Sequence, residues 1–272
     1  MKAMHAPSAL AGATLAPVLE VFASFQGEGR FVGEPQVFVR LWGCPLRCRW
    51  CDTPGSWRLP AEPQARIAAR APRREAGWAG ATDVARWIAE VEPGAPRTVS
   101  VTGGEPLLWP GFVRALRPVL AGRRVHLETA GAHPRALERV LDQVDHISLD
   151  LKLPADMDAS EPVAAAGEGE AVPGDAAEWA GVRVRVLALV RGRDACAKLI
   201  VAGHRRAQEF APLLDDVAEH APGLSVYVQP VTPMNGVPAP SIALLDQVVE
   251  LALERALPAR VVPQVHRALG IP

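Results

Sequence analysis

The stretch WGCPLRCRWCDTPGSW, residues 42–57, brings three cysteines close together in the chain. Cys44, Cys48 and Cys51 follow a C-x3-C-x2-C spacing, and the other cysteine of the 272 residues, Cys196, lies far from them. Thiolates are soft ligands that bind iron–sulfur clusters, zinc or copper(I). The spacing therefore indicates a metal site in this loop.

The number of thiols helps to separate two kinds of site. A cubane iron–sulfur cluster normally takes four thiolates, so three would leave one iron with an open position. A structural zinc site is usually closed by four ligands, and neither a second cysteine pair nor a nearby histidine follows here. We favour a cluster, and zinc remains the alternative. Cys196 sits in an apolar stretch and is expected to be a small buried side chain rather than a fourth ligand.

Two motifs together carry a family resemblance. Trp50 places an aromatic residue directly before the last cysteine, and a Gly-Gly-Glu-Pro run follows at residues 103–106. The pair resembles the radical S-adenosylmethionine (SAM) superfamily. In that superfamily a [4Fe-4S] cluster binds SAM through its unique iron and splits it to a 5′-deoxyadenosyl radical, so the cofactors carry the difficult chemistry. The resemblance implies both cofactors.

The flanking sequences narrow the resemblance. The segment FASFQGEGRFVGEPQVFVRLWGCPLRCRWCDT, residues 22–53, is similar to the N-terminal signature of 7-carboxy-7-deazaguanine synthases of the queuosine pathway, and QVHRALGIP at residues 264–272 is similar to their C-terminus. This implies a lyase that abstracts hydrogen from C6 of 6-carboxy-5,6,7,8-tetrahydropterin, contracts the ring and releases ammonia. Mg²⁺ would orient the substrate carboxylate.

The resemblance also implies which residues contact each group. The substrate contacts are Phe25, Gln26, Gly27, Glu28, Arg40, Thr102, His266 and the terminal carboxylate of Pro272. The cofactor contacts are Gly103, Gly104, Glu105, Glu128, Asp150, Leu151, Lys152, Gln229, Pro230, Val231 and Thr232. Thr53 is the implied Mg²⁺ ligand, because that hard ion takes oxygen ligands. The sequence identifies no general base.

The hydrophobic pattern predicts an α/β fold. Short strands are expected at residues 19–25, 36–42, 98–102, 125–129, 146–151, 197–202, 225–229 and 260–264, with helical patterns between most of them. Strands that alternate with helices form a parallel sheet with right-handed crossovers. We expect a partial or modified (β/α) barrel with the cysteine loop at the C-terminal strand ends. Residues 19–272 would form one domain, with insertions near 58–80 and 155–181.

Composition limits the partners and the location. The formal net charge of −1 and the pI near 6.7 argue against nucleic acid or a membrane surface as an obligatory partner. Residues 1–18 are expected to be a flexible extension rather than a signal peptide, because their apolar run is weak and broken by Pro7. A cysteine cluster site favours a reducing compartment, so we expect the cytoplasm. The resemblance adds a homodimer and a flavodoxin or ferredoxin as electron donor.

Lysine is rare in this chain, since only Lys2, Lys152 and Lys198 occur among 29 basic residues. The two interior lysines hint that a compact ammonium group is needed there, although an ordinary surface lysine remains the alternative for Lys198. Two other functions also stay open. A glycyl-radical-enzyme activase shares the cluster loop and the Gly-Gly-Glu motif but needs a groove for a large partner. A structural or sensor metal protein explains the cysteines but not that motif.

Overall fold

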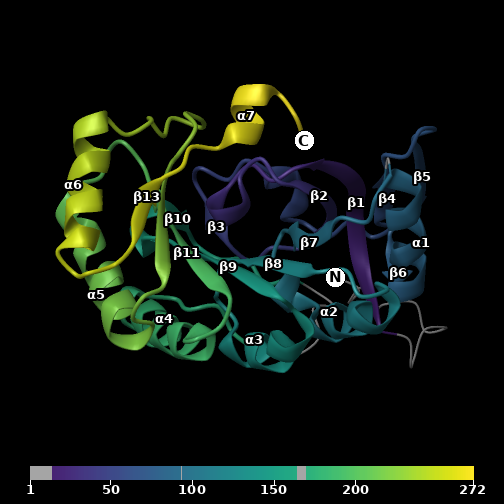
Figure 1. Cartoon of the computed structure of the whole chain (residues 1–272), viewed down its shortest axis with the longest axis horizontal. Coiled ribbons are helices and arrows are strands. Elements are labelled where there is room, and N and C mark those ends of the chain that lie inside the picture. The colour runs from purple at the N-terminus through teal and green to yellow at the C-terminus, as the bar shows by residue number, and fades with distance from the viewer. Residues whose placement is uncertain (1–13, 93, 164–169) are drawn as a thin grey trace.

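One curved sheet organises the part of the chain that the computed structural model describes, residues 14–92, 94–163 and 170–272 (Figure 1). Its parallel strands are, in spatial order, β2 (Pro35–Leu41), β7 (Thr98–Gly103), β8 (Val125–Thr129), β9 (His146–Leu151), β11 (Ala195–Val201), β12 (Ser225–Pro230) and β13 (Ala259–Val261). The sheet does not close on itself, because β13 and β5 are its edges. The predicted partial barrel with parallel strands is confirmed.

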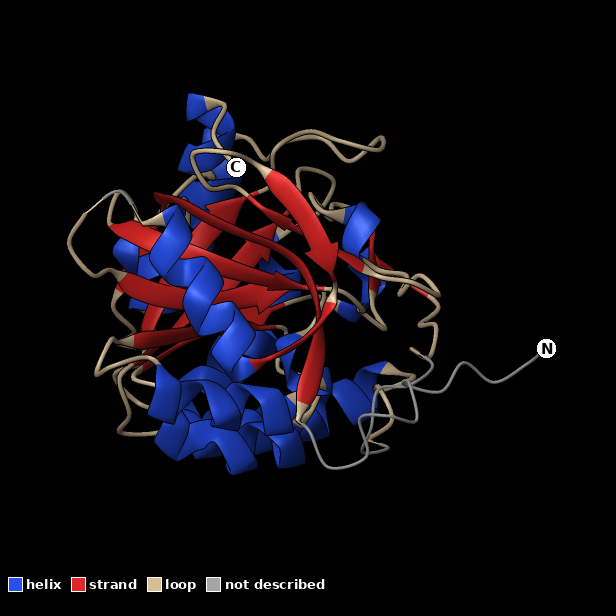
Figure 2. Ribbon diagram, turned by 90° about the vertical axis from the view of Figure 1, so that its right-hand side faces the viewer, coloured by secondary structure: helices blue, strands red, loops and turns tan. Residues whose placement is uncertain are grey.

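A helix lies in each crossover between these parallel strands. The helices are α1 (Ala81–Val91), α2 (Pro110–Leu116), α3 (Pro134–Val140), α4 (Ala176–Val190), α5 (Ala211–His220) and α6 (Ile242–Leu253). Successive helices contact one another along the outer face of the sheet (Figure 2). The short helix α7 (Val265–Leu269) lies instead at the open side of the barrel, near the C-terminus (Figure 1).

The alternation of side chains along the strands produces two different faces. In β7, Val99 and Val101 join the apolar core that the helices complete, while Ser100 and Thr102 face the opposite way. In α1 the buried Val84, Trp87, Ile88 and Val91 supply the matching helical stripe, as the sequence pattern predicts. The inner face of the barrel is therefore largely polar.

The N-terminal region differs from the prediction at two places. Strand β1 (Leu15–Phe25) begins four residues before the expected start and pairs antiparallel with β2. The segment expected to be an insertion or irregular lobe near 58–80 contains β4 (Gln64–Ile67), β5 (Arg73–Ala76) and β6 (Trp78–Gly80), which extend the sheet beyond β1. Residues 1–13 of the predicted N-terminal extension lie outside the described residues.

The second predicted insertion, near 155–181, also contains regular structure. Its β10 (Met157–Asp158) pairs with β3 (Arg47–Cys48), and its last residues begin α4. Helix α4 was not predicted from the sequence, because the alternating run VRVRV at residues 182–186 is typical of a strand. Helix α7 was not predicted either. It follows β13, which ends three residues before the predicted end of that strand. Residues 164–169 lie outside the described part.

None of the helices within the described ranges combines the length and the apolar character that crossing a bilayer requires.

Candidate active site

A pocket lies at the carboxyl ends of the parallel strands, as expected for this class of fold. Most of the predicted site residues line it. They are Phe25, Gln26, Gly27, Glu28, Arg40, Cys44, Cys48, Cys51, Thr53, Thr102, Gly103, Gly104, Glu128, Asp150, Lys152, Gln229, His266 and Pro272. The remaining five do not line it: Glu105, Leu151, Pro230, Val231 and Thr232. The loop with the cysteines follows β2 directly, which puts it at the predicted end of the barrel.

The cysteine loop is held in place by its surroundings. The guanidinium of the buried Arg47 donates to the carbonyls of Cys44 and Leu46 at 2.7 and 2.8 Å. The main chain of Cys48 pairs with Met157 of β10. Burial raises the pKa of the Cys48 thiol to about 12 and also raises the pKa of Cys44 and of Cys51. Burial therefore disfavours free thiolates in this loop, and a bound metal would supply the positive charge that stabilises them.

The placement of the thiols distinguishes a cluster from a single zinc ion. A tetrahedral zinc ion with Zn–S bonds of about 2.3 Å needs sulfur atoms about 3.8 Å apart. The three cysteines do not form a group whose ligand atoms all lie within 4.8 Å of one another, although such a group of other residues exists among the described residues. The loop therefore fits a larger multinuclear cluster better than one ion.

The two glycines at the end of β7, Gly103 and Gly104, are required by the close approach of two main chains. A Cβ on Gly104 would lie 2.0 Å from the carbonyl oxygen of Gly43, and Gly103 has a φ of +123°. The glycines were expected to let a cofactor come close, but the cysteine loop itself already packs against them. Glu105, which we expected to contact the cofactor, is fully buried and accepts hydrogen bonds from Leu107 N, Thr129 Oγ1 and Ala130 N. Its carboxylate fixes the strand end.

A chain of alternating charges crosses the floor of the pocket. The Lys198 ammonium lies 2.7 Å from Glu28 Oε2 and 2.9 Å from Asp150 Oδ1, and Lys152 also pairs with Asp150. Burial opposes the charge on Lys198, but the adjacent carboxylates outweigh it and raise the lysine pKa well above its usual value. Lys198 lines the pocket but was not among the predicted site residues, although the rarity of lysine in the chain hinted at it.

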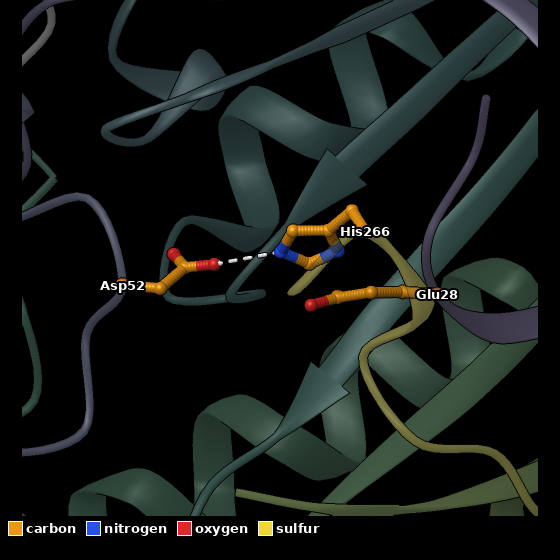
Figure 3. Close-up of side chains that lie close together, drawn as sticks. All are labelled: Glu28, Asp52 and His266. Carbon is orange, nitrogen blue, oxygen red and sulfur yellow. Dashed lines mark hydrogen bonds and ion pairs between the residues drawn. The ribbon is translucent and has the colours of Figure 1, made fainter. Parts of the chain in front are cut away.

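The segment 264–272 crosses the pocket and is attached to both the substrate side and the cluster loop. His266 Nε2 lies 3.3 Å from Asp52 Oδ2, and Arg267 donates to the Asp52 carbonyl at 2.8 Å. Gln264 Nε2 donates to Glu28 Oε1 at 2.8 Å. Figure 3 shows Glu28, Asp52 and His266 converging from different parts of the chain.

Asp52 is a further site residue that the sequence analysis missed. Burial disfavours its charge, but the hydrogen bond and charge of His266, with Arg40 and Arg267, lower its pKa to about 2. One ligand atom from each of Glu28, Asp52 and His266 lies within 4.8 Å of the others, so the set could hold a metal ion. These carboxylates already face Lys198, Arg267 and the His266 ring, and we interpret the set as an attachment point of the segment.

Four predicted residues have specific surroundings. Arg40 donates to Glu20 at 2.8 Å and lies over the Phe22 ring. Thr53 Oγ1 lies 3.9 Å from Cys51 Sγ. Thr232 does not line the pocket itself, but its Oγ1 donates to the lining residue Gln264 at 2.7 Å. The Oε1 atom of Gln229 is buried and has no hydrogen-bond partner within the described ranges, so it is available to accept a hydrogen bond from a ligand.

Comparisons with known proteins agree with this geometry. A model of the Radical SAM superfamily matches residues 42–164. The chain is 32% identical to a 7-carboxy-7-deazaguanine synthase of Methanothermobacter thermautotrophicus, over 94% of this chain and 98% of that protein. A synthase of the same name from Geobacter sulfurreducens is 32% identical over 92% and 96%. The crystal structure of QueE from Escherichia coli has the same fold, with a TM-score of 0.59, 22% identity and coverage of 94% of this chain and 99% of that chain.

Proposed function

This chain belongs to the 7-carboxy-7-deazaguanine synthase family of radical SAM enzymes, and we propose that its pocket binds 6-carboxy-5,6,7,8-tetrahydropterin for conversion into 7-carboxy-7-deazaguanine. One observation carries the proposal. The three cysteines lie in the same pocket as Glu28, Arg40 and His266, the residues expected to bind the pterin. The activase and sensor alternatives have no need of such a combination.

The pocket residues divide between the two cofactors that the family implies. Cys44, Cys48 and Cys51 would hold the [4Fe-4S] cluster and leave one iron without a protein ligand. Gly103 and Gly104 line the same pocket. Asp150 and Lys152 would lie along SAM, and the unpartnered Gln229 oxygen suits an amino group such as that of adenine. When bound, the cluster and SAM supply a radical that starts the reaction.

The charges of the pocket residues complement the polar groups of the pterin substrate. The pterin edge presents adjacent N–H donors, which the Glu28 carboxylate can accept as a pair, while the Arg40 guanidinium suits the substrate carboxylate. Lys198 already donates to Glu28 Oε2 at 2.7 Å and Gln264 Nε2 to Glu28 Oε1 at 2.8 Å, so the carboxylate is oriented before the substrate arrives. Pro272 and His266 complete the wall.

Mg²⁺ fits the oxygen-rich side of the pocket. Thr53 lies beside Asp52 on the cluster loop, and a hydroxyl together with the substrate carboxylate and water matches the ligands that this ion prefers. We also propose a homodimer that works in the cytoplasm and receives electrons from a flavodoxin or ferredoxin. A small acidic electron carrier is the natural donor for a cluster that needs a strong reductant.

The test is an anaerobic assay of the reconstituted protein with dithionite, Mg²⁺, SAM and 6-carboxytetrahydropterin. Mass spectrometry would follow 5′-deoxyadenosine and 7-carboxy-7-deazaguanine, with Cys51→Ala as the variant that loses the cluster and Cys196→Ser as the matched control that keeps it. Formation of both products supports the proposal. Deoxyadenosine without deazaguanine would mean another substrate, and a loaded cluster that gives neither product would contradict radical chemistry.

A further inference from the structure

A second polar layer lies directly beneath the pocket on the inner face of the barrel. Its side chains are Ser100, His126, Ser148 and Cys196, which lie on four neighbouring strands and are all buried. Each stands two residues before a pocket residue of the same strand: Thr102, Glu128, Asp150 and Lys198. Side chains two residues apart on a strand point to the same face. The proposed reaction does not use this layer.

The layer forms a continuous path of hydrogen bonds. From the pocket inward, Ser100 Oγ donates to Glu128 Oε1 at 2.7 Å, and it lies 3.5 Å from His126 Nδ1. His126 Nε2 lies 2.8 Å from Ser148 Oγ. Ser148 Oγ is 3.4 Å from Cys196 Sγ, within the longer reach of hydrogen bonds to sulfur. Glu128 thus connects to a cysteine below the pocket.

The path continues to the outer surface. Cys196 Sγ lies 3.6 Å from His146 Nε2, and His146 Nδ1 lies 2.9 Å from Asp194 Oδ1. The Asp194 side chain is 37% exposed and also pairs with Arg30 and Arg124. Burial opposes its charge, but His146 and the two arginines lower its pKa. Asp194 therefore passes a proton readily to water.

Every intermediate member of the path can both accept and donate. Serine, cysteine and neutral histidine each have one proton and at least one acceptor site. Burial lowers the pKa of His126 and of His146, which keeps both rings neutral. The ring of Phe31 contacts both imidazoles edge-on, at centroid distances of 5.4 and 4.5 Å, and shields them on one side. A proton can therefore enter at one end while another leaves at the other.

We propose that this path carries protons between Glu128 in the pocket and Asp194 at the surface. The proposal rests on the proposed function. Loss of ammonia after ring contraction breaks a carbon–nitrogen bond and a carbon–hydrogen bond and forms a double bond, so the step involves no net oxidation or reduction. Glu128 takes the proton from carbon and returns to its carboxylate form by passing that proton to Ser100 and outward, while the departing nitrogen takes its proton from solvent.

The test compares two substitutions at Cys196, which lies outside the pocket. Cys196→Ala removes one link, whereas Cys196→Ser keeps a group that accepts and donates. Because acid–base catalysis typically contributes about 10²–10⁴-fold, we expect the alanine variant to form product at least about tenfold more slowly in a single turnover. The serine variant should stay within about twofold of the parent protein. Ser148→Ala breaks the next link and should match Cys196→Ala.

A second measurement, independent of turnover, follows the protonation state of Glu128 directly. In the unreduced complex with SAM and pterin, infrared difference spectra after a pH jump would report the protonation of Glu128, with the band assigned by Glu128→Gln. The relaxation should slow in Cys196→Ala and Ser148→Ala but not in Cys196→Ser. Equal relaxation in all variants would overturn the path. If calorimetry shows no pterin binding, the proposed function fails instead, and the same jump with SAM alone still decides the path.

Discussion

Replacement of Asp52 by asparagine tests how segment 264–272 is attached. A carboxyl pKa lowered from 3.8 to about 2 corresponds to a stabilisation of ~2.4 kcal/mol by the folded surroundings. The side chain is 26% exposed, so we expect the loss in Asp52→Asn to be about 2 kcal/mol. Asparagine keeps the shape but removes the charge that His266 and Arg267 face. The segment should therefore detach more often.

Hydrogen exchange measures this detachment. The Val265 amide donates to the Gly27 carbonyl at 2.9 Å, so its exchange reports when the segment lifts. A loss of about 2 kcal/mol corresponds to about thirtyfold faster exchange of this amide in Asp52→Asn. Asp216→Asn, which removes an ion pair with Arg183 far from the segment, is the control and should leave this amide unchanged. Equal exchange in Asp52→Asn and the parent protein would refute the attachment.

The same carboxylate predicts a pH dependence. Because the folded pKa of Asp52 is depressed, its stabilisation is present above the unfolded pKa near 3.9 and is lost as the pH falls from about 4 towards 2. After correction for the intrinsic exchange rate, the Val265 amide should therefore lose protection over this window. Asp52→Asn should show no such change, since asparagine does not titrate there.

Three further predictions concern the pocket. Lys198→Met removes the cation that Glu28 and Asp150 share, two half-buried carboxylates, while Lys152 still pairs with Asp150. The variant should therefore lower the free energy of unfolding, measured in urea, by about 3 kcal/mol, the lower end for a broken buried pair. Gly104→Ala places a Cβ 2.0 Å from a carbonyl oxygen of the cysteine loop and should lower the iron bound after reconstitution, whereas Gly55→Ala, with nothing within 4 Å, should not. Residues added after Pro272 should raise KM for the pterin, because Pro272 lines the pocket, and a tag placed at Met1 should leave KM unchanged.

The parts of the site that the sequence predicted are those whose chemistry is local. Three cysteines within eight residues indicate a metal site through their spacing alone, and the Gly-Gly-Glu run adds to the family resemblance. The placement of Glu28 and His266 in one pocket also followed from motifs at the two ends of the chain. In each case the residue types indicate the chemistry, and the fold brings these residues together at the strand ends.

The parts that the sequence missed depend on partners far away in the chain. Asp52 has its role only because His266 and Arg267 return across the pocket, and Lys198 because Glu28 and Asp150 lie on other strands. The strands near 58–80 were missed for the same reason. Strands β4 and β6 pair with β1, which begins about fifty residues before β4, so the composition of the segment does not reveal them. Helix α4 was hidden by local alternation that tertiary packing overrides.

The pairing of β3 with β10 has a consequence for the kinetics of folding. Cys48 lies next to Met157 in this small sheet, so the loop that receives iron is completed by residues more than a hundred positions later. Contacts between distant residues form slowly, because a long chain segment must first be closed. A peptide covering only residues 42–57 should therefore bind iron poorly, and efficient cluster assembly must wait until the strands up to β10 have folded.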